Sequence, residues 1–95
     1  MDLKDYIESI PGFPKEGIIF RDVTPILQNA KAMRYCVDQL NAFVKEVGAD
    51  IIVAPEARGF LFGVPVALES GIGFIPVRKP GKLPRETVNE SYDLE

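Results

Sequence analysis

The sequence predicts an α/β fold with a parallel sheet, and three neighbouring segments carry that prediction. Residues 50–54 contain an unbroken β-branched run, which is typical of a strand covered on both faces. Residues 60–70 are predicted to form a helix that ends at Gly71, although Pro65 lacks an N–H group and should kink or delay it. Residues 73–77 form a second apolar strand. Strand, helix and strand in this order predict a right-handed βαβ unit with parallel strands.

A long amphipathic helix is predicted just before this unit. Asn29 suits its N-cap, and Gly48 suits its C-terminal end. We interpret Cys36 as a small buried hydrophobe, because the chain has no histidine to activate a catalytic thiol. Apolar residues recur at spacings of three and four and share one helix face: Met33, Cys36, Val37, Leu40, Phe43, Val44 and Val47.

The N-terminal 28 residues are less regular. Asp2 can cap a short helix that Pro11 and Gly12 would end. The stretch "FPKEGIIFRDVTPIL", residues 13–27, is rich in proline and glycine. We expect from it only a short extended piece near residues 18–20, followed by turns.

Composition excludes several classes of function. The chain has eleven basic and fourteen acidic residues and a net charge of −3, so no basic field attracts nucleic acid. No apolar run approaches the roughly 20 residues that span a bilayer, and acids stand near the start where a secretory signal carries bases. A single cysteine fits a reducing compartment, so we expect a cytoplasmic protein without membrane or nucleic-acid partners. Without histidine, chemistry must use carboxylates, amines, backbone groups or a hard metal ion.

The stretch "VAPEARGFLFG" places polar residues in the elbow between the first strand and the helix. Ligands of open α/β sheets bind beyond the carboxyl ends of strands, where a helix N-terminus attracts phosphate. Gly59 permits close backbone approach, and Arg58 offers a planar fork for phosphate oxygens. The alternative is a solvated turn on which Arg58 pairs with Glu56, and the elbow alone leaves both interpretations open.

The stretch "RKPGKLPRE", residues 78–86, is a basic loop that follows the second strand. Parallel strands of a βαβ unit end on one side of the sheet, so the loop should converge with Arg58 on one anionic ligand. Taken alone, such a loop is usually solvated surface. Its bases are Arg78, Lys79, Lys82 and Arg85.

A third candidate site is the short run Ile19, Phe20 and Arg21. Phe20 can offer its ring face to a planar ligand while the neighbouring backbone reads the edge of that ligand. The alternative is a core phenylalanine beside a surface ion pair.

Taken together, four blocks of this sequence resemble the adenine phosphoribosyltransferase family, in its order and at its separations. They are "FPKEGIIFRDVTPIL", "APEARGFLFG", "PVRKPGKLP" and "SYDLE". The resemblance covers the whole chain and implies the type I phosphoribosyltransferase fold, with a partial parallel sheet, flanking helices and an N-terminal hood-like segment. It also implies a homodimer and the Mg²⁺-dependent conversion of adenine and phosphoribosyl pyrophosphate to AMP and pyrophosphate.

The resemblance also implies roles for particular residues. The purine would meet the backbones of Ile19 and Arg21 and the ring of Phe20. Pyrophosphate would contact the elbow, which would hold a non-proline cis peptide, and the basic loop. The residues of this pyrophosphate site would be Glu56, Ala57, Arg58, Gly59, Arg78, Lys79 and Lys82. Glu95 and Arg58 would be the catalytic residues, Glu95 as general acid or base. No protein metal ligands are implied, so Mg²⁺ would bind mainly through the substrate.

One block of the family is missing from this sequence. The missing block is a later strand followed by two acids and a threonine- and glycine-rich turn, which in this family binds the ribose phosphate. We therefore expect a truncated or split form that is inactive alone, completed by a homodimer mate or a complementary C-terminal chain. The predicted organisation is one incomplete domain, residues 1–95, with a hood-like segment at 1–28, an αβαβ core at 29–78, and a flexible basic loop and arm at 79–95.

Three alternatives stay open. The chain can be a non-catalytic assembly or dimerisation fragment, which would bind neither adenine nor pyrophosphate. It can be a regulator on the same fold that senses phosphoribosyl pyrophosphate, although no basic DNA-binding module precedes residue 13. It can also serve another purine, because backbone recognition at residues 19–21 does not separate 6-amino from 6-oxo purines by residue type.

Overall fold

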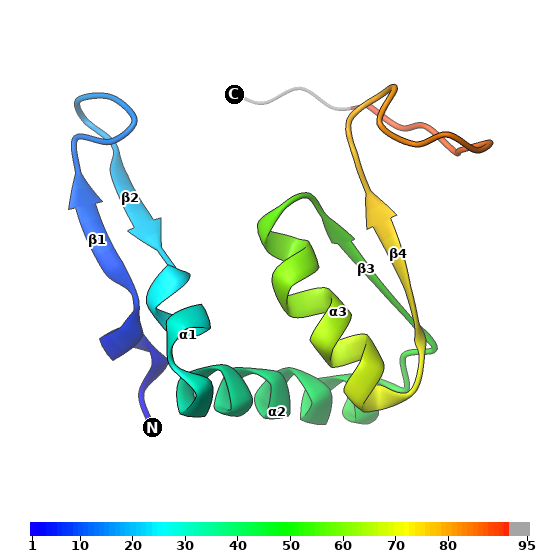
Figure 1. The fold of residues 1–95 in the computed structure, drawn as a ribbon, viewed down its shortest axis with the longest axis horizontal. Helices are drawn as coiled ribbons and strands as arrows, with labels where there is room; N and C mark the ends of the chain where they lie inside the picture. The colour runs from blue at the N-terminus through cyan, green and yellow to red at the C-terminus, as the bar shows by residue number, and fades with distance from the viewer. Residues whose placement is uncertain (92–95) are drawn as a thin grey trace. The chain divides into compact units, whose positions relative to one another are not determined.

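The computed structural model describes residues 1–91, and the chain divides into two compact units, Met1–Ala49 and Asp50–Glu95 (Figure 1). Each unit is built around its own two-stranded sheet. The first unit contains the 3₁₀ helix η1 (Leu3–Tyr6), the strands β1 (Glu8–Pro11) and β2 (Ile19–Asp22), and the helices α1 (Thr24–Gln28) and α2 (Ala30–Val47). The second contains β3 (Ile51–Pro55), α3 (Arg58–Ser70) and β4 (Gly73–Val77).

The predicted N-terminal helix is wrong beyond its first turn. Asp2 does cap a turn, since its side chain accepts a hydrogen bond from the Lys4 N–H group, but only η1 follows. Glu8–Pro11 is instead β1, which pairs antiparallel with β2 in the register Glu8↔Asp22 to Pro11↔Ile19. A helix of two turns is marginal in water, whereas pairing with β2 satisfies the backbone of the segment.

The amphipathic helix α2 forms between its predicted end residues, Asn29 and Gly48. The Asn29 side chain accepts a hydrogen bond from the Ala32 N–H group at 3.0 Å, and Gly48 ends the helix at φ 67°. Val37 and Val44 are buried on its apolar face, and Cys36 is partly buried. Burial raises the pKa of the Cys36 thiol, which supports its interpretation as a small hydrophobe.

The expected apolar face of α2 is only partly covered. Leu40, Phe43 and Val47 are exposed. Within the first unit, α2 packs against α1 and η1, and these short elements contact only part of an 18-residue helix. Sequence periodicity therefore identifies the apolar face, but it does not say how much of that face a neighbour covers.

The second unit is the predicted βαβ unit, with β3 and β4 parallel in the register Ile51↔Gly73 to Pro55↔Val77. Helix α3 packs on one face of this sheet (Figure 1). Gly63 allows this contact, because a Cβ atom there would lie 2.5 Å from the Phe74 ring. On the other face, Ile51, Val53, Ile75 and Val77 are exposed, so the expected cover on both faces is not provided by the elements described in this unit.

Helix α3 begins two residues before the predicted start, at Arg58, and contains Pro65 in its interior. The proline therefore does not delay the helix. Val66 and Ala67 are buried just after it, and this packing holds the helix past the missing hydrogen bond. Gly71 ends the helix at φ 72°, as predicted. In the part of the chain that is described, no helix is long and apolar enough to cross a membrane.

Candidate functional site

The elbow and the basic loop begin side by side at one edge of the β3–β4 sheet. Pro55 and Val77 are the last paired residues of the two strands. The ladder continues by one hydrogen bond, from the Glu56 N–H group to the Val77 carbonyl at 3.0 Å. The two segments therefore begin at the same edge of the sheet, as the parallel pairing of the strands predicts.

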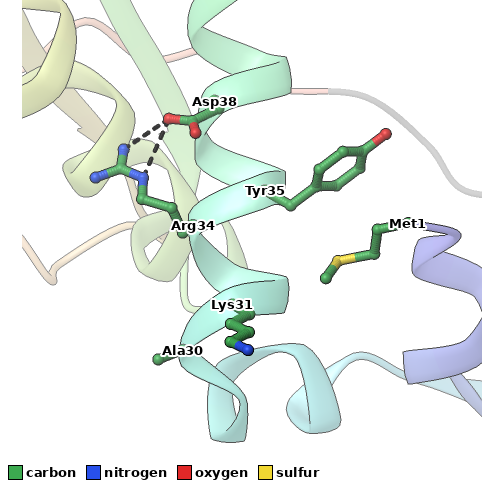
Figure 2. A pocket seen from close by; sticks show the side chains of 6 residues that line it. All are labelled: Met1, Ala30, Lys31, Arg34, Tyr35 and Asp38. Atoms are coloured by element: carbon green, nitrogen blue, oxygen red, sulfur yellow. Dashed lines mark hydrogen bonds and ion pairs between the residues drawn. The ribbon is translucent and has the colours of Figure 1, made fainter.

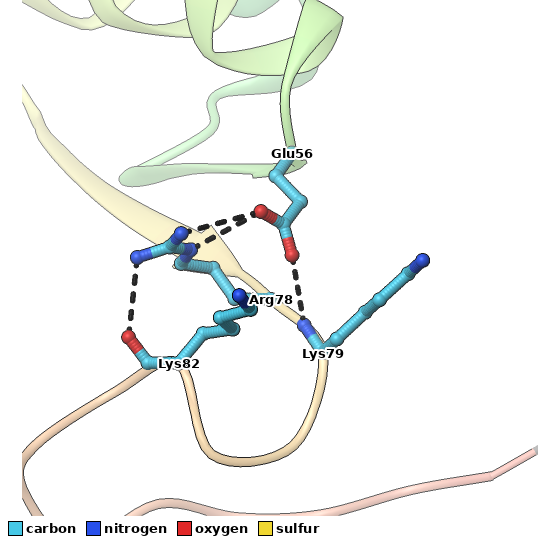
Figure 3. A network of polar contacts seen from close by, with 4 residues as sticks. All are labelled: Glu56, Arg78, Lys79 and Lys82. Atoms are coloured by element: carbon cyan, nitrogen blue, oxygen red, sulfur yellow. Dashed lines mark hydrogen bonds and ion pairs between the residues drawn. The ribbon is translucent and has the colours of Figure 1, made fainter.

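A polar network joins the elbow to the loop (Figure 3). One oxygen of the Glu56 carboxylate, Oε2, accepts hydrogen bonds from Nε and Nη2 of Arg78, both at 3.3 Å. The other oxygen, Oε1, accepts from the Lys79 N–H group at 3.0 Å. Arg78 also donates from Nη1 to the Lys82 carbonyl at 3.1 Å. A single carboxylate thus contacts two consecutive residues of the loop, and the guanidinium spans the loop from its first residue to its fifth.

Hydrogen bonds and nearby positive charges lower the pKa of Glu56. The hydrogen bond from the Lys79 N–H group is the largest cause that lowers the pKa of Glu56, and the Arg78 and Lys82 charges lower it further. Desolvation acts in the opposite direction without reversing the shift. The carboxylate is therefore negative at neutral pH and accepts from both of its partners.

The remaining elbow residues lie at the start of α3. The Glu56–Ala57 peptide bond is cis, as the resemblance implies. Ala57 stands at the N-cap without a side-chain capping bond, and Arg58, an exposed residue, opens the helix. A Cβ atom on Gly59 would lie 2.9 Å from the Ala54 Cβ, so the absence of a side chain at this position lets α3 pack closely on β3.

On β2, the backbones of Ile19 and Arg21 face the open edge of the hairpin. The Gly12 N–H group donates to the Ile18 carbonyl at 2.7 Å, which makes that pair hydrogen-bonded. Hydrogen-bonded and non-hydrogen-bonded pairs alternate along an antiparallel ladder, so Ile19 and Arg21 occupy non-hydrogen-bonded positions. Their N–H and C=O groups therefore point away from β1, toward an edge on which no further strand lies in the described residues.

The ring of Phe20 is not a core side chain. It is partly exposed and makes an edge-to-face contact with Phe13, with ring centroids 5.2 Å apart and an interplanar angle of 81°. Sequence reasoning missed Phe13, and its signal would have been a second aromatic residue in the proline-rich block before Phe20. Arg21 donates from Nη1 to the Ser9 hydroxyl on the paired strand, so its side chain is directed across the hairpin toward β1.

The residues predicted to form the site fall in different parts of the structure. Glu56, Arg78, Lys79 and Lys82 contact one another within the second unit, whereas residues 19–21 belong to the first. The predicted catalytic residue Glu95 lies outside the described residues. Among residues 1–91, no cluster of three or more carboxylate, histidine or cysteine side chains is arranged to hold a metal ion.

Of the surface pockets, one borders the basic loop and another lies apart from the predicted site residues. A cavity of about 580 Å³ borders the basic loop and is lined by Val77, Arg78, Pro80, Val88, Asn89, Glu90 and Ser91. A second pocket, of about 410 Å³, lies on the first unit between Met1 and the start of α2 (Figure 2). Figure 2 shows Met1 and Tyr35 on one side of α2 and the Arg34–Asp38 ion pair on the other. No predicted site residue lines this second pocket.

Comparison with known proteins identifies relatives along the full chain. No model of a known protein family matches. The chain is 61% identical over 95 residues to adenine phosphoribosyltransferase of Clostridium acetobutylicum. This match covers 100% of this chain and 55% of the relative. It is 58% identical over 93 residues to the Yersinia pseudotuberculosis enzyme of the same name, covering 98% of this chain and 50% of the relative. The chain therefore spans about half the length of the curated relatives it matches.

Solved structures agree with this match. Adenine phosphoribosyltransferase of Thermoanaerobacter pseudethanolicus superimposes with a TM-score of 0.90 at 53% identity, covering 96% of this chain and 54% of that one. The Saccharomyces cerevisiae enzyme, complexed with adenine and an imino-altritol bisphosphate, gives a TM-score of 0.91 at 42% identity over 98% and 55% of the two chains. The predicted fold class is confirmed: the architecture is that of about half of a type I phosphoribosyltransferase.

Proposed function

We propose that this chain, a homologue of adenine phosphoribosyltransferases that spans about half of their length, supplies the purine and pyrophosphate sites of such an enzyme. The proposed reaction is the purine-salvage step in which adenine and phosphoribosyl pyrophosphate give AMP and pyrophosphate. One observation carries the proposal: the chain, all of which matches part of these enzymes, brings Arg78, Lys79 and Lys82 together at the elbow that begins with Glu56. The proposed location is the cytoplasm.

On the purine side, we propose recognition by the open edge of β2. An outward-facing residue of a strand offers one N–H donor and one C=O acceptor side by side. Ile19 and Arg21 each present such a pair, which matches the amino donor and ring-nitrogen acceptor of adenine. The partly exposed ring of Phe20 would lie against the purine and position it for attack on the anomeric carbon.

On the pyrophosphate side, the chain's own groups would stabilise the departing charge. The Lys79 and Lys82 ammonium groups and the Arg78 guanidinium would balance the negative oxygens of the leaving group. The Ala57 and Gly59 backbone and Arg58 would meet them at the start of α3, where the helix dipole favours an anion.

For Mg²⁺, we propose binding mainly through substrate oxygens, because Glu56, the carboxylate of the elbow, already accepts from Arg78 and Lys79. When bound, the ion would offset further charge on the leaving group. We propose that Glu95 acts as general acid or base on the purine, and that a dimer mate or a complementary chain completes the ribose-phosphate site.

Two measurements on the purified chain test this function. Adenine and pyrophosphate are each titrated by calorimetry, and AMP formation is followed with adenine, phosphoribosyl pyrophosphate and Mg²⁺. We expect weak binding of both ligands, and turnover once a chain that spans the other half of a relative is added. If neither ligand binds at millimolar concentration and the added half restores no turnover, the chain is an assembly fragment and the proposal is wrong.

A further inference from the structure

We propose that Glu56 is a positioning residue that fixes the first five residues of the basic loop, residues 78–82, on the elbow in the geometry that receives a phosphoryl anion. The proposal rests on the proposed function for the identity of the anion. Its structural part, the attachment of the loop by one carboxylate, is testable without a ligand.

The two oxygens of Glu56 hold two different kinds of donor. Oε1 accepts from a backbone N–H group, that of Lys79, which fixes the main chain where the loop leaves β4. Oε2 accepts from Nε and Nη2 of Arg78, which fixes the plane of the guanidinium. The Glu56 main chain is itself held by its N–H bond to the Val77 carbonyl. The main chain of Glu56 is therefore held at the end of β3, and its side chain in turn holds the loop.

Arg78 transmits this attachment to the far side of the loop. Its Nη1 atom donates to the Lys82 carbonyl, and the Lys82 N–H group donates to the Lys79 carbonyl at 3.2 Å. The five residues thus form one closed turn on Glu56. A guanidinium has five N–H donors, and the three contacts leave two of them, together with the Lys79 and Lys82 ammonium groups, for an anion.

The Arg78–Glu56 pair is less exposed to solvent than the ion pair of the first unit. The side chains of Arg78 and Glu56 are 34% and 25% exposed. In the first unit, Arg34 and Asp38 form a shorter ion pair, at 2.9 Å, but their side chains are 53% and 54% exposed. Exposed pairs contribute little, and Asp38 fixes no loop, so the Arg34–Asp38 pair is the matched control within the same chain.

The experiment compares Glu56→Gln, Glu56→Ala and the control Asp38→Asn with the parent chain. Amide ¹H–¹⁵N spectra are recorded against pH without ligand, and pyrophosphate is then titrated at neutral pH. In the parent chain the Lys79 amide shift should follow the ionisation of Glu56, and this pH dependence should vanish in both Glu56 variants. Glutamine keeps a neutral acceptor for the Lys79 N–H group, so we expect about threefold weaker pyrophosphate binding in Glu56→Gln and about tenfold weaker binding in Glu56→Ala. Asp38→Asn should leave both readouts unchanged.

The outcomes separate this proposal from the proposed function. A Lys79 amide whose pH dependence survives Glu56→Gln overturns the attachment. Pyrophosphate binding that is equal or tighter in Glu56→Ala overturns the positioning role, since the carboxylate would then only compete with the ligand. If the parent chain binds no pyrophosphate although its Lys79 amide titrates as expected, the loop attachment stands and the proposed ligand is wrong. Unchanged amide shifts elsewhere in the spectrum show that the variants fold.

Discussion

Gly63 of α3 and Phe74 of β4 lie so close that a side chain at position 63 would force the ring or the helix to move. A Cβ atom there would lie 2.5 Å from Cε1 of the Phe74 ring and 3.3 Å from the Ala54 Cβ. The Phe74 ring is also in edge-to-face contact with Phe60, with centroids 5.7 Å apart, so it is held on two sides. At this point of contact, the close approach of helix and sheet in the second unit depends on one glycine and one aromatic ring.

Gly63→Ala should destabilise the chain. The methyl group must displace the Phe74 ring or lift the helix, and overpacking of this kind typically costs about 1–3 kcal/mol of unfolding free energy. Urea unfolding followed by far-UV circular dichroism measures the loss. Leu68→Ala, on the same helix at a side chain that is 82% exposed, is the control and should change little. If Gly63→Ala is as stable as Leu68→Ala, the close contact is not tight in solution.

The lowered pKa of Glu56 predicts a pH dependence of stability. A carboxyl group whose pKa is lower in the folded state than in the unfolded state stabilises the fold above its unfolded pKa. That contribution disappears as the pH falls through the folded pKa. We therefore expect the parent chain to be more stable than Glu56→Gln at neutral pH, and the two to converge as the pH is lowered below about 4. Urea unfolding at several pH values measures this, and a constant difference would contradict the assignment.

Asn29→Ala should weaken the start of α2. The Asn29 side chain is the acceptor for the Ala32 N–H group, and loss of an N-cap typically costs about 1 kcal/mol. Hydrogen exchange of the Ala32 amide should accelerate more than that of residues in the middle of the helix. Asn29→Asp keeps a capping oxygen and should retain most of the protection. Equal loss in both variants would mean that the capping bond is not the cause.

Phe20→Ala should weaken adenine binding by about tenfold, because the purine would lose an aromatic surface against which to stack. Isothermal titration with adenine measures the effect. Phe43→Ala is the matched control, because Phe43 is an exposed phenylalanine on α2 that the proposal places outside the site. If both variants bind adenine as the parent chain does, the purine does not lie against Phe20.

Local signals in the sequence predicted several elements well. Asn29, Gly48 and Gly71 mark helix ends by the chemistry of a single residue, a capping side chain or a left-handed backbone. The β-branched run at residues 51–53 and the apolar run that begins at Gly73 predicted the parallel strands, because buried strands need continuous apolar sequence. These signals act over a few residues, so the sequence alone contains them.

Glu8–Pro11 shows what such signals miss. Its apolar spacing suits a helix, yet it forms β1 because β2, which begins eight residues after β1 ends, provides backbone partners. Likewise, one interpretation of the sequence paired Glu56 with Arg58, two residues away. In the structure the Glu56 carboxylate bonds Arg78 and Lys79, 22 and 23 residues along the chain.

By itself, then, the sequence determined the helix ends, the βαβ order and the convergence of an elbow and a basic loop at one sheet edge. Only the tertiary structure decided which charged groups meet there, and that the backbones of Ile19 and Arg21 face an open edge. The physical reason is the same in both cases. Hydrogen-bond partners across paired strands depend on register, and register is set by contacts between segments that are distant in the sequence.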